Sequence, residues 1–241
     1  NWTDLAFQIP SVVPKDRITS DPRGVMGDGK TPQDQLLNVY KRDPRRAATQ
    51  LRLANRSRWG SDTLRQEVGV YWQDTDDLFN NMTSHTVTHS RTAGAQWQAS
   101  GRPAGRDGAL GWRTALSWAD SAMQRDLYAT NPANGTQMQR FGSYDLGAQN
   151  LQALAAADWR LAPGWTLLGS VQWSHLTRDA QSRSSAAQLN QDWSFATPKI
   201  GLNWAATPTT RLWANLSRSH EAPTFWEIVS ASVAPNSPAT A

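Results

Sequence analysis

Apolar and polar residues alternate with a period of two along most of the chain from about residue 47 onward. Such alternation is typical of β-strands whose two faces meet different surroundings. The stretch 110–119 is the clearest example. One face there carries Leu110, Trp112, Thr114, Leu116 and Trp118, and the other carries Gly111, Arg113, Ala115, Ser117 and Ala119. The pattern predicts an all-β chain.

The connections between these segments alternate between short turns and long polar stretches. The short turns are GS, GRPAGRDG, APG and ATPT, and the long stretches lie around residues 74–85, 121–149 and 177–193. Because successive antiparallel strands reverse direction, all the short turns fall at one edge of the sheet and the long stretches at the other. We therefore predict an antiparallel up-and-down meander of about eight strands, with loops at 121–149 and 177–193.

Tryptophan usage suggests where the apolar face lies. The chain has 13 Trp against 5 Phe and 4 Tyr, although its apolar fraction is only 39% and its mean hydropathy is −0.61. Trp favours sites where one end of the ring is apolar and the other is wet, as at a membrane interface. Trp165 and Trp173 lie on one face, roughly 20 Å apart along the membrane normal for a tilted strand. A soluble β-sandwich also alternates, but the strict parity of the connections favours a barrel.

Several function classes are disfavoured by composition. The net charge is only +4 and the basic residues, nearly all Arg, are scattered, which argues against nucleic-acid binding. Cysteine is absent, so thiolate catalysis, disulfide scaffolds and Cys-ligated metals are excluded for these residues. No catalytic motif is present, and no cofactor is expected. His85 and His89 are four positions apart, but in a strand or loop this spacing does not present them together as metal ligands.

The first 46 residues lack lasting periodicity and are predicted to be mostly loop. The segment 1–10 is compatible with a short strand, and TPQDQLLNVY with one helical turn that has Thr31 as its N-cap. Strands are expected over 47–220. Because the sequence begins without Met and stops in a loop-like stretch, we expect it to be a piece of a longer protein.

The segment Ser194–Ile228, SFATPKIGLNWAATPTTRLWANLSRSHEAPTFWEI, carries the most specific motifs. A strand with P-K-hydrophobic-G-hydrophobic leads through a short turn to a strand ending in S-R-S, followed by E-x-P-[TS]-F-x-E-[LI]. This segment resembles the mid-barrel region of TonB-dependent outer-membrane receptors. The motif positions are Lys199, Gly201, Ser217, Arg218, Ser219, Glu221, Pro223, Thr224, Phe225 and Glu227. We expect them to fix the exit from strand to loop.

The resemblance implies part of a 22-stranded transmembrane β-barrel, with 221–241 as an extracellular loop and the plug domain absent from this chain. It implies a receptor in the outer membrane rather than an enzyme. The expected partners are membrane lipid, a small-molecule ligand such as a ferric siderophore, and TonB, which acts through the plug. No nucleic acid or metal ion is expected as a partner. A passive porin-like or structural outer-membrane barrel is the main alternative, and a soluble β-sandwich binding module is a weaker one.

The barrel interpretation assigns the two faces and a ligand site. We expect lipid contact from Leu64, Val68, Val70, Leu110, Leu116, Leu151, Leu167, Val171, Ile200, Leu202, Leu212 and Leu216. The lumen should receive Arg65, Glu67, Arg113, Asp158, Arg160 and Lys199. Guanidinium groups and aromatic rings suit anionic and planar ligands. We therefore predict ligand capture on the extracellular side by Arg125, Tyr128, Arg140, Phe141 and Tyr144.

Overall fold

The computed structural model describes residues 2–8, 15, 18–22, 38–61, 63–103 and 109–229. These residues form a single sheet and two one-turn helices, α2 (Val39–Arg42) and α3 (Phe225–Ile228). The strands are β1 (Trp2–Gln8), β2 (Arg45–Gly60), β3 (Leu64–Asn80), β4 (Ser84–Gly101), β5 (Leu110–Thr130), β6 (Gln137–Ala162), β7 (Trp165–Ser182), β8 (Gln188–Ala205) and β9 (Arg211–Ser217). Within the described residues, neither helix has the length and apolarity that crossing a membrane would need.

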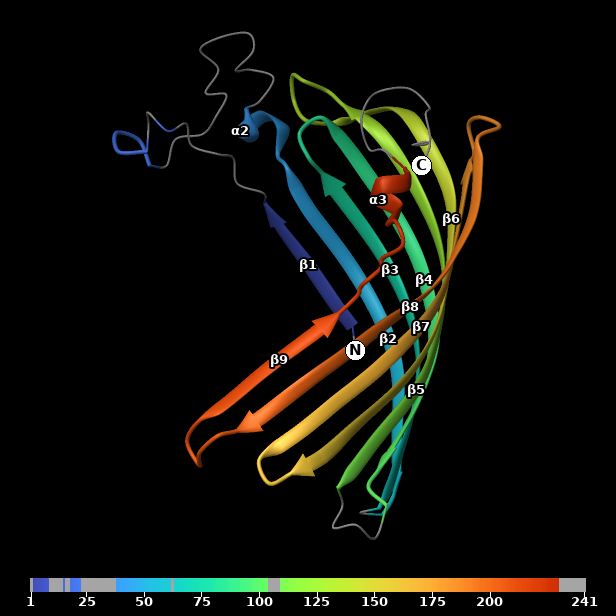
Figure 1. The fold of residues 1–241 in the computed structure, drawn as a ribbon. Helices are drawn as coiled ribbons and strands as arrows, with labels where there is room; N and C mark the ends of the chain where they lie inside the picture. The colour runs from blue at the N-terminus through green and yellow to red at the C-terminus, as the bar shows by residue number, and fades with distance from the viewer. Residues whose placement is uncertain are drawn as a thin grey trace.

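The strands pair in sequence order from β1 to β9, and every pair is antiparallel. The predicted meander is therefore confirmed, with nine strands because Trp2–Gln8 pairs with the upper part of β2. The sheet curves into an open trough with β1 and β9 at its two edges, and α3 lies on the concave side (Figure 1). Much of the region 1–46 that was predicted to be loop, Thr31 included, and residues 230–241 lie outside the described residues.

Successive turns lie at alternate ends of the strands, as the meander requires, but the predicted alternation of short and long connections is wrong. The long stretches around 74–85, at 121–149 and at 177–193 are mostly strand, since β3 continues to Asn80 and β4 begins at Ser84. Strand β5 continues to Thr130 and β6 begins at Gln137, so only a short turn joins them. Likewise β7 continues to Ser182 and β8 begins at Gln188. The polar segments are thus long strand extensions. Their alternation is weak because both of their faces are polar, whereas the backbone ladder needs no apolar side chains to continue.

The register separates the predicted lipid and lumen residues without exception. Residues opposite one another in an antiparallel ladder share a face, so a row can be followed across the sheet. One such row runs from Val70 through Ala95 and Trp118 to Leu151. All twelve apolar residues predicted to face lipid lie on the face of this row, here called the outward face. The six charged residues predicted for the lumen lie on the opposite, inward face.

The outward face has an uncharged band bordered by tryptophan. Along β5 this band runs from Leu110 to Trp118, and along β7 from Trp165 to Trp173. The Trp165 and Trp204 rings stack at its lower border, with centroids 5.0 Å apart. Nine residues per strand fit the roughly 9–11 that a tilted transmembrane strand requires. The polar strand extensions begin beyond the second tryptophan, so they project past the band.

The assignment of faces predicts unequal costs for arginine at adjacent positions. In the protein folded in lipid vesicles, Leu116→Arg should lower the free energy of unfolding by about 2–4 kcal/mol, because the charge would enter lipid. Ala115→Arg is the matched control, since it points inward, and it should cost far less. Urea titration measures both values, and equal costs would contradict the assignment.

Successive turns lie at alternate ends of the strands, so only the turns at one end should be accessible from outside the cell. Ala133→Cys, in the exposed turn between β5 and β6, should react with an impermeant maleimide on whole cells. Gly135 is unsuitable for this test because its φ is +72° and an added Cβ would lie 2.6 Å from the Arg42 backbone. Thr209→Cys, at the opposite edge, should react only after permeabilisation. Labelling of Thr209→Cys alone would invert the predicted orientation.

Candidate ligand site

The inward face is strongly basic. In β2 to β9 it carries eleven basic side chains against three acidic ones, Glu67, Asp77 and Asp158. The basic residues are Arg46, Arg52, Arg56, Arg58, Arg65, Arg113, Arg125, Arg160, Arg178, Lys199 and Arg211. The same strands carry seven Asp and three Arg on the outward face. The sheet therefore separates positive from negative charge between its two faces.

The three inward acids are each paired with arginine. Glu67 accepts hydrogen bonds from both Arg56 and Arg58 on the neighbouring strand. Asp77 receives two hydrogen bonds from Arg46, at 2.9 and 3.2 Å. Asp158 accepts one from Arg102 at 2.5 Å. These pairs use all the acidic groups of the inward strand positions, so the wall keeps a net positive charge.

A hollow of about 580 Å³ lies on the basic wall near the turns that join β4 to β5 and β6 to β7. Arg65, Arg113 and Lys199 line it together with the Arg102–Asp158 pair. Gly111 allows this pair to lie flat on the strand, because a Cβ there would meet Asp158 Oδ1 at 2.3 Å. The arrangement suits anionic groups, since cations outnumber the one carboxylate.

The five residues predicted to capture ligand do not form one cluster. Arg125 and Tyr144 lie directly opposite each other on the inward face. Tyr128 and Arg140 are also opposite each other, but on the outward face, where Arg140 Nη1 is 3.3 Å from Asp126 Oδ1. Phe141 lies at the irregularity in the ladder between these two pairs. In a strand, successive side chains point to opposite faces. The five residues were grouped as members of one loop, and that grouping could not show that they lie on two faces.

Helix α3 covers the inward pair. Ile228 and Val229 are 5% exposed and pack on Leu146 and Ala180, with Tyr144 and Met123 at the edge of this cluster. Arg125 is only 4% exposed, and burial lowers the pKa of its guanidinium. Its Nη2 lies 3.6 Å from Met123 Sδ. Arg125 and Tyr144 therefore belong to the wall behind α3.

The family-motif residues lead from the last strand onto the inward wall. Lys199 lines the basic hollow, and Gly201 lies opposite Asn215 in the ladder. Strand β9 ends at Ser217, and the Arg218 backbone N–H donates to the Pro198 carbonyl at 3.2 Å. The segment Ser219–Thr224, here called the strap, then crosses the wall to α3, which contains Phe225 and Glu227. Thr224 and Glu227 form a capping box at the start of α3.

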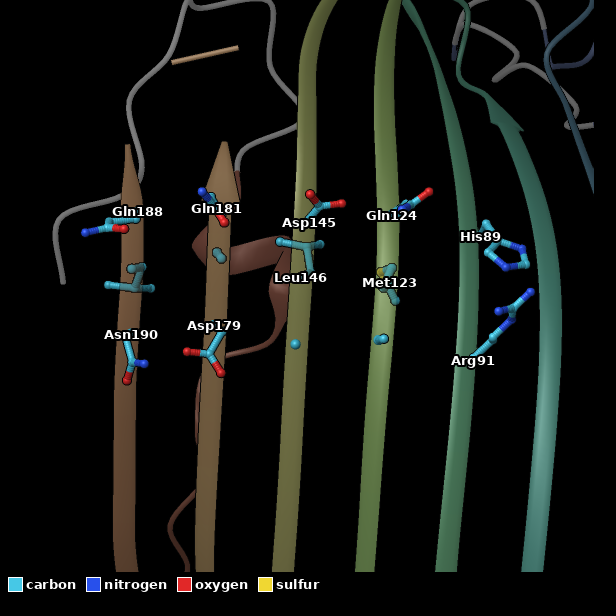
Figure 2. Close-up of a pocket in the computed structure, with 14 residues that line it drawn as sticks. His89, Arg91, Met123, Gln124, Asp145, Leu146, Asp179, Gln181, Gln188 and Asn190 are labelled. Atoms are coloured by element: carbon cyan, nitrogen blue, oxygen red, sulfur yellow. The ribbon is translucent and has the colours of Figure 1, made fainter. Parts of the chain in front are cut away.

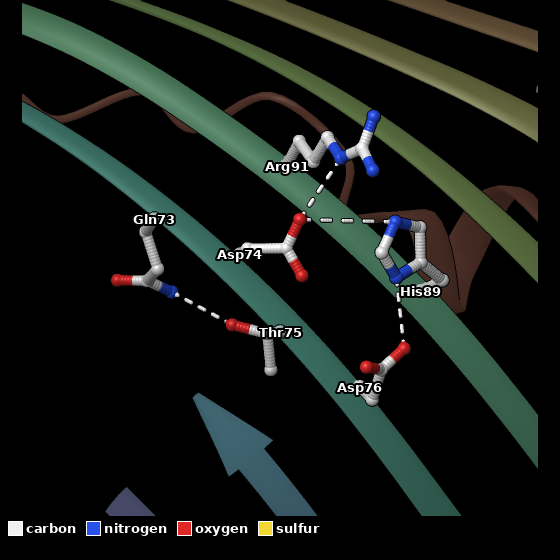
Figure 3. Close-up of polar contacts among 6 residues, drawn as sticks. All are labelled: Gln73, Asp74, Thr75, Asp76, His89 and Arg91. Carbon is white, nitrogen blue, oxygen red and sulfur yellow. Dashed lines mark hydrogen bonds and ion pairs between the residues drawn. The ribbon is translucent and has the colours of Figure 1, made fainter. Parts of the chain in front are cut away.

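The outward face carries a charged cluster above the tryptophan border, which the sequence analysis missed. His89 Nδ1 lies 2.8 Å from Asp76 Oδ1, and Arg91 Nε donates to Asp74 Oδ2 at 2.9 Å (Figure 3). His85 is separate, because its ring is buried and its Nε2 lies 3.0 Å from the Gly135 carbonyl. The two histidines therefore do not act together. Arg91 lies 2.9 Å from Asp74 Oδ2 and His89 lies 2.8 Å from Asp76 Oδ1, so each carboxylate of this surface cluster has a partner on β4.

A shallow hollow of about 920 Å³ lies beside this cluster. Figure 2 shows its polar side chains distributed along neighbouring strands β4 to β8, among them Asp145, Asp179 and Asn190. These side chains belong to the outward face by register. The hollow is thus on the opposite side of the sheet from Arg125, Tyr144 and the strap.

The trough is similar in fold to parts of several solved structures. The unliganded ferric citrate transporter FecA has a TM-score of 0.62 and 10% identity, over 71% of this chain and 27% of FecA. The ferric yersiniabactin uptake receptor FyuA from Yersinia pestis has a TM-score of 0.52 and 14% identity, over 72% of this chain and 28% of FyuA. The copper transporter OprC has a TM-score of 0.58 and 15% identity, over 77% and 31%. These likenesses concern the fold.

The chain spans less than a third of the length of each of these transporters. No curated protein sequence matches it. The family model described as TonB dependent receptor-like, beta-barrel matches residues 3–241. That match, the meander topology and the uncharged outward band agree with one another. The chain therefore belongs to the TonB-dependent receptor-like β-barrel family, whose members are transporters of the outer membrane.

Proposed function

We propose that this chain is part of a receptor that takes up an anionic metal chelate of the ferric siderophore class by extracellular binding and TonB-energised transport. The observation that supports this proposal is the charge of the inward wall, which carries eleven basic side chains and three acidic ones. A wall of one sign raises the local concentration of oppositely charged ligands. It therefore favours an anionic cargo over a neutral or cationic one.

The three solved structures compared above are named for cargoes that contain a metal, which agrees with the proposed class of cargo. FecA and FyuA are described as carrying ferric citrate and ferric yersiniabactin, and OprC as carrying copper. TonB-dependent receptors act together with TonB, and in this proposal the contact to TonB is made by a plug domain outside residues 1–241. Within this chain, we assign ligand attraction to the inward wall, with Arg125 and Tyr144 at its upper, extracellular end.

A panel of radiolabelled ferric chelates tests the proposal. The full-length receptor would be expressed in cells that lack their own siderophore receptors, with and without TonB. Ferric citrate and a ferric tris-catecholate, both anionic, should accumulate in the TonB-containing cells only, whereas a cationic ferric trihydroxamate should accumulate much less. Accumulation that does not depend on TonB would indicate a passive porin, and accumulation of none of these chelates would contradict the proposed cargo class.

The division of the predicted ligand residues leads to a sharper prediction. Arg125→Ala should weaken cell-surface binding of the transported chelate, because it removes an inward positive charge. Arg140→Ala is the matched control, since its guanidinium lies on the outward face next to Asp126. Binding isotherms on whole cells, normalised to receptor abundance, compare the two variants. An equal loss, or no loss in Arg125→Ala, would remove Arg125 from the ligand site.

A further inference from the structure

Two segments from distant parts of the sequence are fastened to the upper ends of β3 and β4. One is α2, at the top of the sheet in Figure 1, and the other is the β5–β6 turn over residues 131–136. Asn80 and Tyr128 flank His85 there in one row of the outward face, and neither they nor the turn residues carry a charge. Asn80 is 2% exposed and His85 is 6% exposed, since α2 covers the first and the turn covers the second.

Helix α2 is held by hydrogen bonds in both directions. The Asn80 Nδ2 group donates to the carbonyls of Arg42 and Asp43, both at 2.9 Å. The Arg42 guanidinium, on a residue that is 4% exposed, donates to the Met82 carbonyl at 2.5 Å. The Met82 N–H in turn donates to Asn80 Oδ1 at 3.1 Å. The helix and the β3–β4 turn therefore share one polar network.

The β5–β6 turn closes over this network through Gly135. Its carbonyl lies 3.0 Å from His85 Nε2, and because a carbonyl can only accept, the ring donates a proton from Nε2. The Gly135 backbone also packs on Arg42, since an added Cβ would meet Arg42 Cα at 2.6 Å. The positive φ of +72° makes this close approach dependent on glycine. One residue of the turn thus contacts both His85 and α2.

The cations around His85 disfavour a further positive charge. Arg42 packs on the same glycine that His85 contacts, and Arg45 lies opposite Asn80 in the same row of the ladder. Protonation of the ring would keep the Nε2–H donor, but it would place a charge in a buried site. Burial therefore lowers the pKa of the His85 ring, and the neighbouring Arg45 guanidinium lowers it as well.

The carboxylates of the surrounding elements already have cationic partners. Asp43, next to α2, lies 3.1 Å from the Arg45 guanidinium. On β5, Asp126 lies 3.3 Å from the guanidinium of Arg140. Within the described residues, His85 itself makes no ion pair with a carboxylate. A proton on this ring would therefore be more stable in water than in the closed contact.

We propose that Arg42, Asn80, His85 and Gly135 form a proton-sensitive latch, in which neutral His85 holds the β5–β6 turn against α2 and protonated His85 releases it. The closed latch binds fewer protons than the open one. Closure is therefore most stable above the ordinary pKa of histidine, about 6.5, and weakens as the pH falls below that value. The latch lies on the opposite face from the basic wall and does not depend on the proposed cargo. It would make the extracellular end of the receptor respond to external acidity.

The distance between two nitroxide labels tests the latch directly. Labelled cysteines would replace Tyr40, which is 77% exposed in α2, and Ala133, which is exposed in the turn, in the full-length receptor. Double electron–electron resonance should give one narrow distance at about pH 7.5 and a second, longer distance that grows as the pH falls to about 5. The ratio of open to closed latch should rise by up to about tenfold per pH unit, the limit for one proton.

Two histidine variants assign the response to its residue. His85→Gln should abolish it, because the glutamine amide can donate to the Gly135 carbonyl but does not titrate. His89→Gln is the matched control, since His89 lies on the same face of β4 but pairs with Asp76 at 2.8 Å, and it should keep the wild-type response. A wild-type distance that does not change with pH, or a response that persists in His85→Gln, would overturn the latch.

Arg45→Gln provides a second test if His85→Gln fails to fold, which heat-modifiable gel mobility would report. Removing this cation should move the midpoint of opening to higher pH, because the positive charge that opposes protonation of His85 is gone. An unchanged or lower midpoint would contradict the latch. These distances are measured without any chelate, so the latch can fail while the proposed function holds, and the reverse.

Discussion

The hydrogen-bonded ladder between antiparallel neighbours is the constraint on which the rest of this structure depends. A strand in lipid has no water to satisfy its backbone, so every N–H and C=O must pair with an adjacent strand. The pairing from β1 to β9 meets this requirement between the two edges of the sheet. It also fixes which side chains share a face, and thereby gives the uncharged outward band and the basic inward wall together. A shift of one residue in β2 or β5 would move inward arginines such as Arg56 and Arg113 to the outward face.

The same ladder continues well beyond the uncharged band, and these strand extensions carry the residues of the candidate ligand site. Strands β5 and β6 run 21 and 26 residues, far more than a bilayer needs. Their extensions carry Arg125, Tyr144 and Leu146, and they provide the surface on which α3 and the strap rest. Binding groups on rigid strands are held more precisely than groups on loops. The charge separation between the faces adds attraction for anions on the side where the strap and the basic hollow lie.

Much of the fold could be predicted from the sequence because the alternation of apolar and polar residues that marks a strand is visible within a short segment. The alternation around Leu110–Trp118 and Trp165–Trp173 predicted these strands and the face to which each of their side chains points. The extensions over 121–149 and 177–193 could not be found in this way, since alternation disappears where both faces are polar. For the same reason, Arg125 and Arg140 were assigned to one site although they point to opposite sides. The latch depends on the register of β3, β4 and β5 and on two distant segments that fold onto the strand ends, neither of which a local pattern contains.

Spin-label accessibility along one strand tests the central claim most directly. Single cysteines would replace residues 110 to 119 of the full-length receptor in lipid vesicles, each labelled with a nitroxide. Collision with oxygen, which concentrates in lipid, should be high at even positions and low at odd ones. Collision with a water-soluble nickel chelate should show the opposite phase. Accessibility without a period of two, or with the phase reversed so that Arg113 faces lipid, would contradict the assignment of faces.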